Sequence, residues 1–168
     1  MIMIALGANL PGLAGPPMAQ LDAALAALDA RGITVVRRSR WWRSPAWPDP
    51  GEPSFVNGVA VLRTALSPAA LMAELHAVEA ALGRRRGRAN APRPVDLDLL
   101  DFDGVVSAGE SGGPVLPHPR MSERAFVLLP VRDVAPGWRH PVSHLDLASM
   151  IARLPPHDMT HPIDRTSE

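Results

Sequence analysis

The order in which the apolar patterns change between residues 2 and 102 constrains the fold of this chain more than any other feature. A short apolar run at the start predicts a buried strand. The segment after it has apolar residues at three- and four-residue spacing, which is typical of a helix. Two β-like segments, a second helix introduced by Ser67-Pro68 and a last strand follow. The predicted strands are residues 2–6, 33–40, 55–64 and 95–102, and the predicted helices are residues 17–30 and 67–83.

The order strand, helix, strand, strand, helix, strand is the split βαβ arrangement. We therefore predict an α+β fold, a ferredoxin-like βαββαβ sandwich. Asp103-Gly104 before Val105-Val106 indicates an added hairpin, because these two turn residues favour a tight β-turn. Apolar residues in 124–134 and 145–154 predict C-terminal helical segments.

The length of 168 residues fits one domain, which we place at residues 1–154, with a loosely held tail at residues 155–168. The chain has no cysteine, which excludes disulfides and thiolate metal sites and is typical of a cytoplasmic protein. All 17 basic residues are arginine, so a Walker-type phosphate loop and a Schiff base are excluded. The net charge is zero and no apolar run is long enough to cross a bilayer. We therefore expect neither nucleic acid nor membrane as a partner, and we expect a monomer.

Two aspartates, Asp96 and Asp98, lie two positions apart in the last predicted strand. Side chains two apart on a strand point to the same face, so both carboxylates lie together while Leu97 and Leu99 face the core. Paired carboxylates repel each other unless cations lie between them, and hard oxygen ligands suit Mg²⁺. We interpret the pair as the ligands of two Mg²⁺ ions that bridge a phosphate. The alternative is a solvated polar face of the sheet without an ion.

Basic residues surround this strand in the sequence. The loop expected at residues 84–94 carries Arg84 and Arg93, and His118 and Arg124 follow the predicted hairpin. Together with the carboxylates, these residues are typical of a site that stabilises a polyphosphate during group transfer. Taken singly, the arginines fit a solvated helix end and the histidine fits a structural position.

Five blocks of the sequence occur in one order, and they are Leu6-Gly7-Ala8-Asn9-Leu10, Ser44-Pro45 to Asn57, Glu79 to Arg84, Pro92 to Leu100, and Pro117 to Phe126. In this order and spacing the chain resembles the 6-hydroxymethyl-7,8-dihydropterin pyrophosphokinase family of folate biosynthesis, over about residues 2–141. The resemblance implies the ferredoxin-like fold. It also implies transfer of the β,γ-pyrophosphoryl unit of ATP to the hydroxymethyl oxygen of a reduced pterin, with AMP as the second product.

The resemblance further implies a role for individual residues. The implied catalytic residues are Arg84, Arg93, Asp96 and Asp98, and the implied ligands of two Mg²⁺ ions are Asp96 and Asp98. The implied ATP-binding residues are Arg84, Arg93, His118 and Arg124. The implied pterin-binding residues are Ser44, Pro45, Trp47, Phe55, Asn57 and Phe126. The two phenylalanines would stack on the ring and the amide would bind its edge; without the resemblance, both phenylalanines fit core packing equally well.

Two other functional classes fit part of the pattern. A nucleotidyltransferase or cyclase palm would use the same aspartates on a similar sheet, and an RNA-binding module would share the topology. The RNA-binding class needs exposed aromatic residues on a basic surface, whereas this chain has three Phe, four Trp and no net charge. The chain departs from the family pattern at Ala8, Asn90, Ala91 and Pro119, which affects the expected closure of the loops over substrate.

Overall fold

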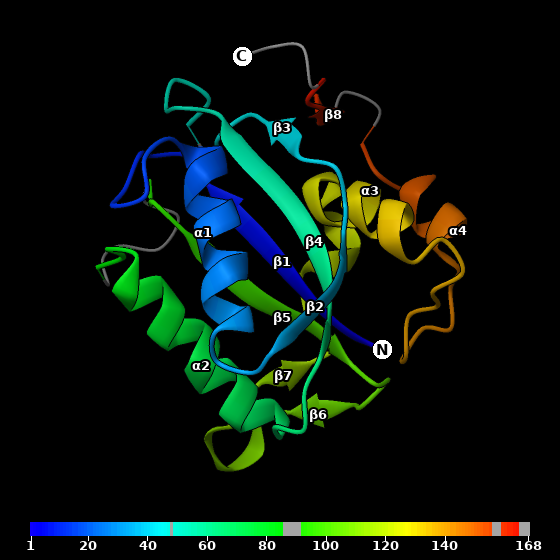
Figure 1. The fold of residues 1–168 in the computed structure, drawn as a ribbon. Coiled ribbons are helices and arrows are strands. Elements are labelled where there is room, and N and C mark those ends of the chain that lie inside the picture. Colours follow the sequence, from blue (N-terminus) through cyan, green and yellow to red (C-terminus); the bar gives the residue numbers. More distant parts are fainter. Residues whose placement is uncertain (48, 86–91, 156–158, 165–168) are drawn as a thin grey trace.

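The first strand, β1 (Ile2–Ala8), is an interior strand of an antiparallel sheet, between β4 (Phe55–Arg63) and β5 (Asp96–Phe102) (Figure 1). Met3 and Ile4 are completely buried, as expected for a strand that is covered on both faces. The computed structural model describes residues 1–47, 49–85, 92–155 and 159–164.

Three shorter strands complete the sheet. β2 (Thr34–Arg38) and β3 (Trp42–Ser44) pair with different halves of β4, and β8 (His161–Pro162) pairs with β3 at the outer edge. The order across the sheet is β5, β1, β4, β3, β8, with β2 beside the other half of β4. β8 belongs to the segment expected to be a loosely held tail, and the Ile163 N–H donates to the Trp41 carbonyl at 2.9 Å. This part of the segment is therefore attached to the sheet.

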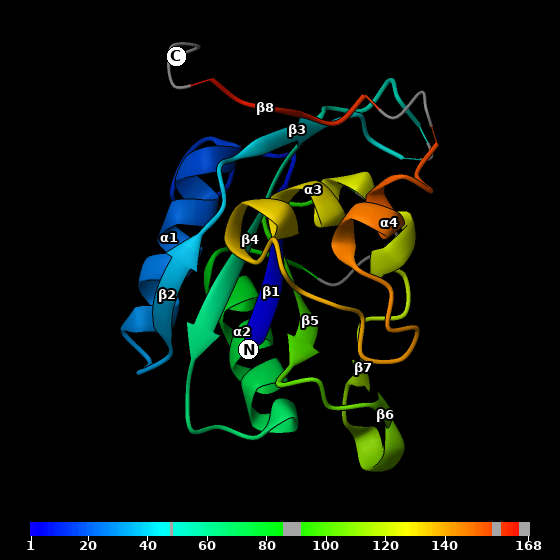
Figure 2. The same ribbon diagram turned by 90° about the vertical axis from the view of Figure 1, so that its right-hand side faces the viewer.

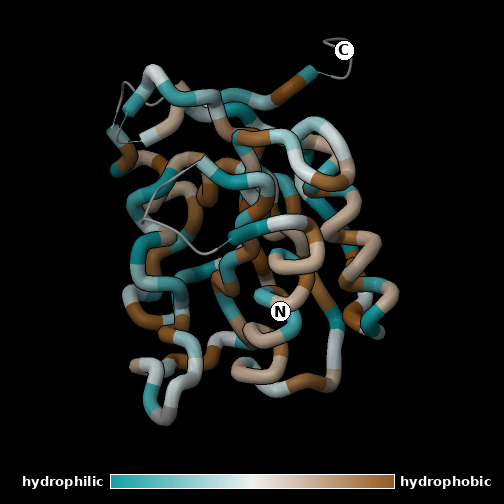
Figure 3. The backbone as a smooth tube through the Cα atoms, turned by 90° about the vertical axis from the view of Figure 1, so that its left-hand side faces the viewer, coloured by the Kyte–Doolittle hydropathy of each residue, from teal (hydrophilic) through white to brown (hydrophobic). Residues whose placement is uncertain are grey.

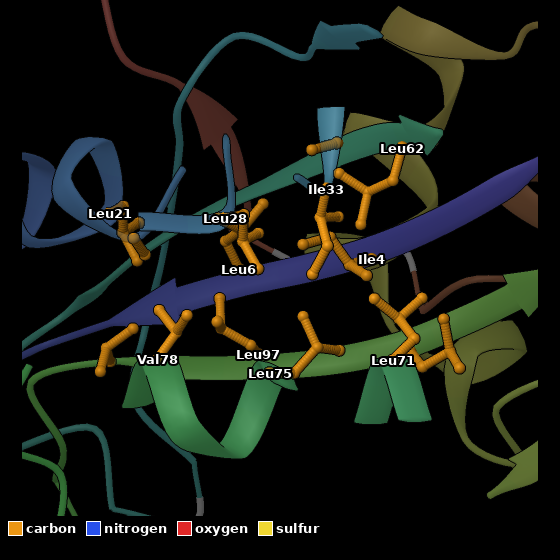
Figure 4. Close-up of a cluster of buried hydrophobic side chains, with 14 of the residues drawn as sticks. Ile4, Leu6, Leu21, Leu28, Ile33, Leu62, Leu71, Leu75, Val78 and Leu97 are labelled. Atoms are coloured by element: carbon orange, nitrogen blue, oxygen red, sulfur yellow. The ribbon is translucent and has the colours of Figure 1, made fainter. Parts of the chain in front are cut away.

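Two helices, α1 (Pro17–Asp29) and α2 (Pro68–Ala81), cover one face of the sheet. Both were predicted, and α2 begins with the expected cap, because Ser67 Oγ accepts the Ala70 N–H at 3.3 Å. The core between helices and sheet is formed mainly by aliphatic side chains, most of them at most 2% exposed (Figure 4). They include Ile4, Leu6, Leu21, Leu28, Leu71, Leu75 and Leu97.

Two further helices, α3 (Ala125–Val134) and α4 (Leu147–Ile151), pack on the opposite face of the sheet (Figure 2). There they bury Met3 of β1 and Val59 and Val61 of β4. Farther along β1, the residues on this face are Ala5 and Gly7, which are only partly buried. The second face of the sheet is therefore covered more completely at one end than at the other.

A hairpin was predicted in which the residues after Asp103-Gly104 pair with β5, and this pairing is wrong. Asp103 and Gly104 do form a turn with positive φ, and the Val105 N–H donates to the Phe102 carbonyl at 2.9 Å. Val106 is 62% exposed and does not continue a strand beside β5. Instead β6 (Ser107–Ala108) pairs with β7 (Val115–Leu116) in a separate small sheet. The two turn residues determine the turn itself, but they do not determine whether the residues after it pair with β5.

The ferredoxin-like α+β fold is confirmed, with the helical C-terminal segments shortened to α3 and α4. In Figure 3 apolar segments run through the interior strands and helices, and polar segments lie mostly in the outer loops. Within the described ranges, no helix is both long and apolar enough to pass through a bilayer.

Candidate functional site

Asp96 and Asp98 occupy the first and third positions of β5, beside the C-terminal half of β1. Leu97 and Leu99 between and after them are each 1% exposed, whereas the two aspartates are partly exposed. The predicted alternation along this strand is therefore confirmed. Both carboxylates arise from the face of the sheet that carries α3, at the end where that face is less covered.

Two arginines hold the side chain of Asp96. Arg84, just beyond α2, forms an ion pair with one carboxylate oxygen, and Nη1 of Arg93 lies 2.9 Å from the other. Arg84 also pairs with Glu79 of α2, and Glu79 Oε1 accepts the Leu97 N–H at 2.7 Å. A buried carboxylate on α2 thus links this helix both to the backbone of β5 and to the arginine at the site.

Burial and neighbouring charges shift the pKa values of Glu79 and Arg84, which link α2 to the site. Burial raises the pKa of Glu79 to about 6, although the Leu97 N–H and the guanidinium of Arg84 both lower it. Burial lowers the pKa of Arg84, but the carboxylates of Asp96 and Glu79 outweigh this effect, so the pKa lies above its ordinary value. Arg84 therefore stays charged at every physiological pH, while Glu79 changes its charge near pH 6.

His118 approaches the site from the segment after β7. Its N–H donates to the Leu100 carbonyl of β5 at 2.8 Å, and its ring Nδ1 accepts the Arg120 N–H at 3.1 Å. Burial lowers the pKa of His118, although the carboxylate of Asp98 opposes this shift. The ring is therefore neutral near pH 7, and its single proton lies on Nε2, where it can be donated to an anion.

Burial shifts the pKa values of Asp98 and Arg124 in opposite directions, and in both cases it disfavours the charged form. Burial raises the pKa of Asp98, and the charge of Asp96 raises it further, while His118 and Arg124 lower it. Burial lowers the pKa of Arg124, and repulsion from Arg120 adds to this shift. Neither charged group is fully compensated by its surroundings. A ligand that brings both phosphate and a divalent cation would stabilise both charges at once.

Three of the predicted pterin-binding residues lie together on β3 and β4. Asn57 Nδ2 donates to Ser44 Oγ at 2.9 Å, and each of these residues is 4% exposed. Phe55 pairs in register with Ser44. Asn57 is opposite Gly7 in β1, and Gly7 is opposite Asp96 in β5. The amide and the carboxylate therefore lie in one row across three strands, with a glycine between them.

The remaining predicted residues are less closely joined to this group. Phe126 lies in the first turn of α3, and the guanidinium carbon of Arg124 is 5.4 Å from the centre of its ring. Pro45 is exposed, and Trp47 is 66% exposed in the loop after β3. The structure does not bury either residue against Asn57. The departures from the family pattern at Asn90 and Ala91 fall outside the described residues.

Asn9 is a site residue that sequence reasoning missed as such. Its Nδ2 donates to the Pro53 carbonyl at 3.0 Å, and its Oδ1 accepts the Arg93 N–H at 2.8 Å. One buried amide therefore joins the proline-rich loop between β3 and β4 (residues 45–54) to the segment that precedes β5. Nothing local in the sequence indicates these two partners. For Glu79 a signal existed, since it is a carboxylate directly beside Val78 of the apolar stripe of α2.

The side chains at this site fit a Mg²⁺ ion that is coordinated by protein carboxylates and phosphate oxygens together. Asp96 and Asp98 supply hard oxygen donors from one face of one strand. No cluster of three or more His, Cys, Asp or Glu suited to a metal ion occurs among the residues that the structure describes. Magnesium ions that act on nucleotides are commonly held by one or two carboxylates together with phosphate oxygens and water. Two carboxylates therefore suffice when a polyphosphate supplies the other ligands.

A model of the 7,8-dihydro-6-hydroxymethylpterin-pyrophosphokinase (HPPK) family matches residues 3–136. Similar curated proteins are named 2-amino-4-hydroxy-6-hydroxymethyldihydropteridine pyrophosphokinase. One from Synechocystis sp. is 38% identical over 153 residues, which are 90% of this chain and 75% of the relative. One from Methylorubrum extorquens is 40% identical over 134 residues, which are 79% of this chain and 81% of the relative.

Among solved structures, a triple mutant of HPPK-DHPS from Plasmodium falciparum with SDX-DHP has a similar fold, with a TM-score of 0.69. The match covers 90% of this chain but only 43% of the other, and the sequences are 12% identical. This likeness supports the architecture alone. The two sequence relatives and the family model carry the argument about function.

Proposed function

Because the chain belongs to the 7,8-dihydro-6-hydroxymethylpterin-pyrophosphokinase family, we propose that it transfers pyrophosphate from ATP to 6-hydroxymethyl-7,8-dihydropterin, a step of folate biosynthesis. In this reaction the hydroxymethyl oxygen forms a bond to the β-phosphorus of ATP. The bond between that phosphorus and the bridging oxygen of AMP breaks, AMP leaves, and the hydroxyl proton is lost. The observation that carries the proposal is the row of Asn57, Gly7 and Asp96 across three strands, which sets an amide suited to a heterocycle one strand away from a carboxylate suited to Mg²⁺, with Gly7 between them.

The cationic residues around β5 bind and orient the triphosphate. Arg84 and Arg93 each contact Asp96 through Nη1, and a guanidinium group can bind phosphate oxygens through pairs of N–H donors. Neutral His118 donates from Nε2, and half-buried Arg124 supplies a further positive charge. Most of the rate enhancement in such a transfer comes from position and from fixed charges. Burial of these donors makes their interactions with phosphate stronger than they would be in water.

We assign Asp96 and Asp98 as the residues that hold two Mg²⁺ ions. When bound, the ions neutralise the phosphate oxygens and stabilise both the attacking and the leaving oxygen. The raised pKa of Asp98 supports this assignment, because a nearby divalent cation would stabilise the ionised carboxylate and so offset the effects of burial and of the charge of Asp96. Chelation of Mg²⁺ with EDTA is expected to stop turnover, and an excess of MgCl₂ is expected to restore it.

On the pterin side, we propose that Asn57 and the backbone near Ser44 and Pro45 bind the polar edge of the ring. The ring would stack between Phe55 and Phe126, and Trp47 would cover it when the proline-rich loop closes. The hydrogen bond from Asn57 to Ser44 supports this role, because it fixes the orientation of the amide. All of these residues belong to one chain, so we propose a monomer whose functional domain is residues 1–154. We propose the cytoplasm as its location, since the chain has no cysteine.

The proposed reaction is tested by its products. The purified protein is incubated with ATP, MgCl₂ and 6-hydroxymethyl-7,8-dihydropterin, and nucleotides and pterins are separated by ion-exchange chromatography. We expect AMP and pterin diphosphate in equal amounts, and no AMP when the pterin is left out. Formation of ADP would indicate a simple kinase, and release of inorganic pyrophosphate would indicate a nucleotidyltransferase or cyclase.

A further inference from the structure

Gly7 lies inside the central strand of the sheet, where glycine is normally unfavourable. A glycine within a strand loses more conformational freedom on folding than alanine does, and this destabilises the folded state. Gly7 is absent from the glycines of the described residues that have positive φ, so the backbone conformation does not require it. A glycine in such a place often marks a position where a ligand or another chain segment approaches the strand closely.

The surrounding side chains do not require a glycine at this position either. A Cβ atom added to Gly7 would lie 3.5 Å from Oδ1 of Asn57 and 3.9 Å from Cδ1 of Phe55, both ordinary van der Waals distances. Gly58, the next residue of β4 after Asn57, is different. A Cβ atom there would lie 2.5 Å from Cζ3 of Trp41, so close packing explains that glycine. For Gly7 the protein leaves room for a methyl group that the sequence does not supply.

The space above Gly7 is bounded by the two side chains assigned to the pterin. Oδ1 of Asn57 lies on the Gly7 side, while its Nδ2 is bound to Ser44. The ring edge of Phe55 forms the second boundary. Gly7 is also opposite Asp96 in register, so it lies between the amide assigned to the heterocycle and the carboxylate assigned to Mg²⁺.

We propose that Gly7 determines specificity for a flat heterocycle, because its missing side chain leaves room for the ring edge against Oδ1 of Asn57. This proposal rests on the proposed function, since it takes the pterin as the ring. A methyl group at this position would contact the same atoms that the ring must contact. It would therefore exclude the pterin without disturbing the fold or the residues that bind ATP.

The test compares Gly7→Ala with the wild-type protein in steady-state kinetics and thermal unfolding. We expect the KM for the pterin to rise about fivefold to a hundredfold, since overpacking a well-fitted site by one methyl group costs roughly 1–3 kcal/mol and 1.4 kcal/mol is a tenfold change. The KM for ATP should stay the same, and the Tm should be equal or slightly higher. Gly137→Ala is the matched control, because a Cβ atom there meets nothing within 4 Å.

Each other outcome overturns the proposal in a recognisable way. An unchanged pterin KM in Gly7→Ala would show that the ring does not occupy this space, while wild-type turnover would still support the proposed function. A lower Tm, or an equal rise in both KM values, would show that Gly7 has a structural role. If the wild-type protein produced no AMP, the proposed function and this inference would both fail.

Discussion

The two ends of one sheet face differ sharply, although the same strands build both. At the end under α3 and α4, Met3 of β1 and Val59 of β4 are completely buried in an apolar cluster. Four residues farther along β1 is Gly7, which lies between Asn57 of β4, two residues before Val59, and Asp96 of β5. The apolar end holds the helices, and the polar end holds the groups suited to a ligand. Stability and binding are therefore separated by only a few positions along each strand.

This separation is possible because the opposite face of the sheet is apolar along its whole length. Ile4, Leu6 and Leu97 pack under α1 and α2 beneath both ends. The sheet is held by that core, so polar groups on the second face need not contribute to folding. Burial without full compensation raises the pKa of Asp98, which is a sign that its ionised form is unfavourable in the folded protein. Substitutions at the two ends should therefore have opposite signatures.

The largest effect is expected for Asp98→Ala. Turnover should fall at least about a thousandfold, because a lost metal ligand removes several kcal/mol of transition-state stabilisation. The Tm should not fall, since the variant removes a charge that burial makes unfavourable. Single-turnover assays and thermal unfolding measure the two quantities, and Asp22→Ala on the exposed side of α1 is the control. Normal turnover in Asp98→Ala would remove the basis for the metal site.

The reverse signature is expected for Leu128→Ala at the apolar end. Leu128 of α3 is completely buried, and such truncations reduce the free energy of unfolding by about 2–5 kcal/mol. The folded variant should keep wild-type KM values, because its cavity lies away from the polar row. Urea unfolding and kinetics well below the Tm test this, with Val142→Ala, 56% exposed, as the control. A specific loss of substrate binding would show that the two ends are not separate.

Features that depend on neighbouring residues could be predicted from the sequence, whereas contacts between distant segments could not. The alternation in β5 and the Ser67 cap of α2 are local signals, and both were confirmed. β3 has three residues, too few for a periodic pattern, and its partner β8 is more than 100 positions away. The hydrogen bonds of Asn9 join segments 44 and 84 positions distant. Such contacts depend on the tertiary fold, so no local pattern indicates them.

A smaller effect, on how the free energy of unfolding depends on pH, should distinguish Glu79 from the exposed carboxylates. Burial raises its pKa from an ordinary value of 4.5 to about 6, so the folded state binds protons more tightly than the unfolded state. The contribution of Glu79 to stability should therefore fall as the pH rises from about 4.5 to 6, by about 2 kcal/mol in total. This loss arises from a carboxylate buried beneath the site, where polar groups are costly.

The variant Glu79→Gln isolates this contribution, because its amide oxygen can still accept the Leu97 N–H. Urea unfolding of both proteins between pH 4.5 and 7 gives the difference in unfolding free energy. Relative to the variant, the wild-type protein should become less stable as the pH rises. Glu74→Gln is the control, since its side chain is 41% exposed against 7% for Glu79. A difference that does not change with pH would contradict the raised pKa.

The smallest expected effect, on the KM for the pterin, tests whether Asn9 couples the two segments to which it is hydrogen-bonded at the polar end. Asn9→Asp keeps the acceptor for the Arg93 N–H but loses the donor to the Pro53 carbonyl. One neutral hydrogen bond contributes about 0.5–1.5 kcal/mol, so the pterin KM should rise about two- to tenfold as the proline-rich loop loosens. The KM for ATP should stay constant, whereas Asn9→Ala, which loses both bonds, should raise both values. Equal changes in the two variants would mean that the two loops respond together, because their separate hydrogen bonds would then have no separate consequences.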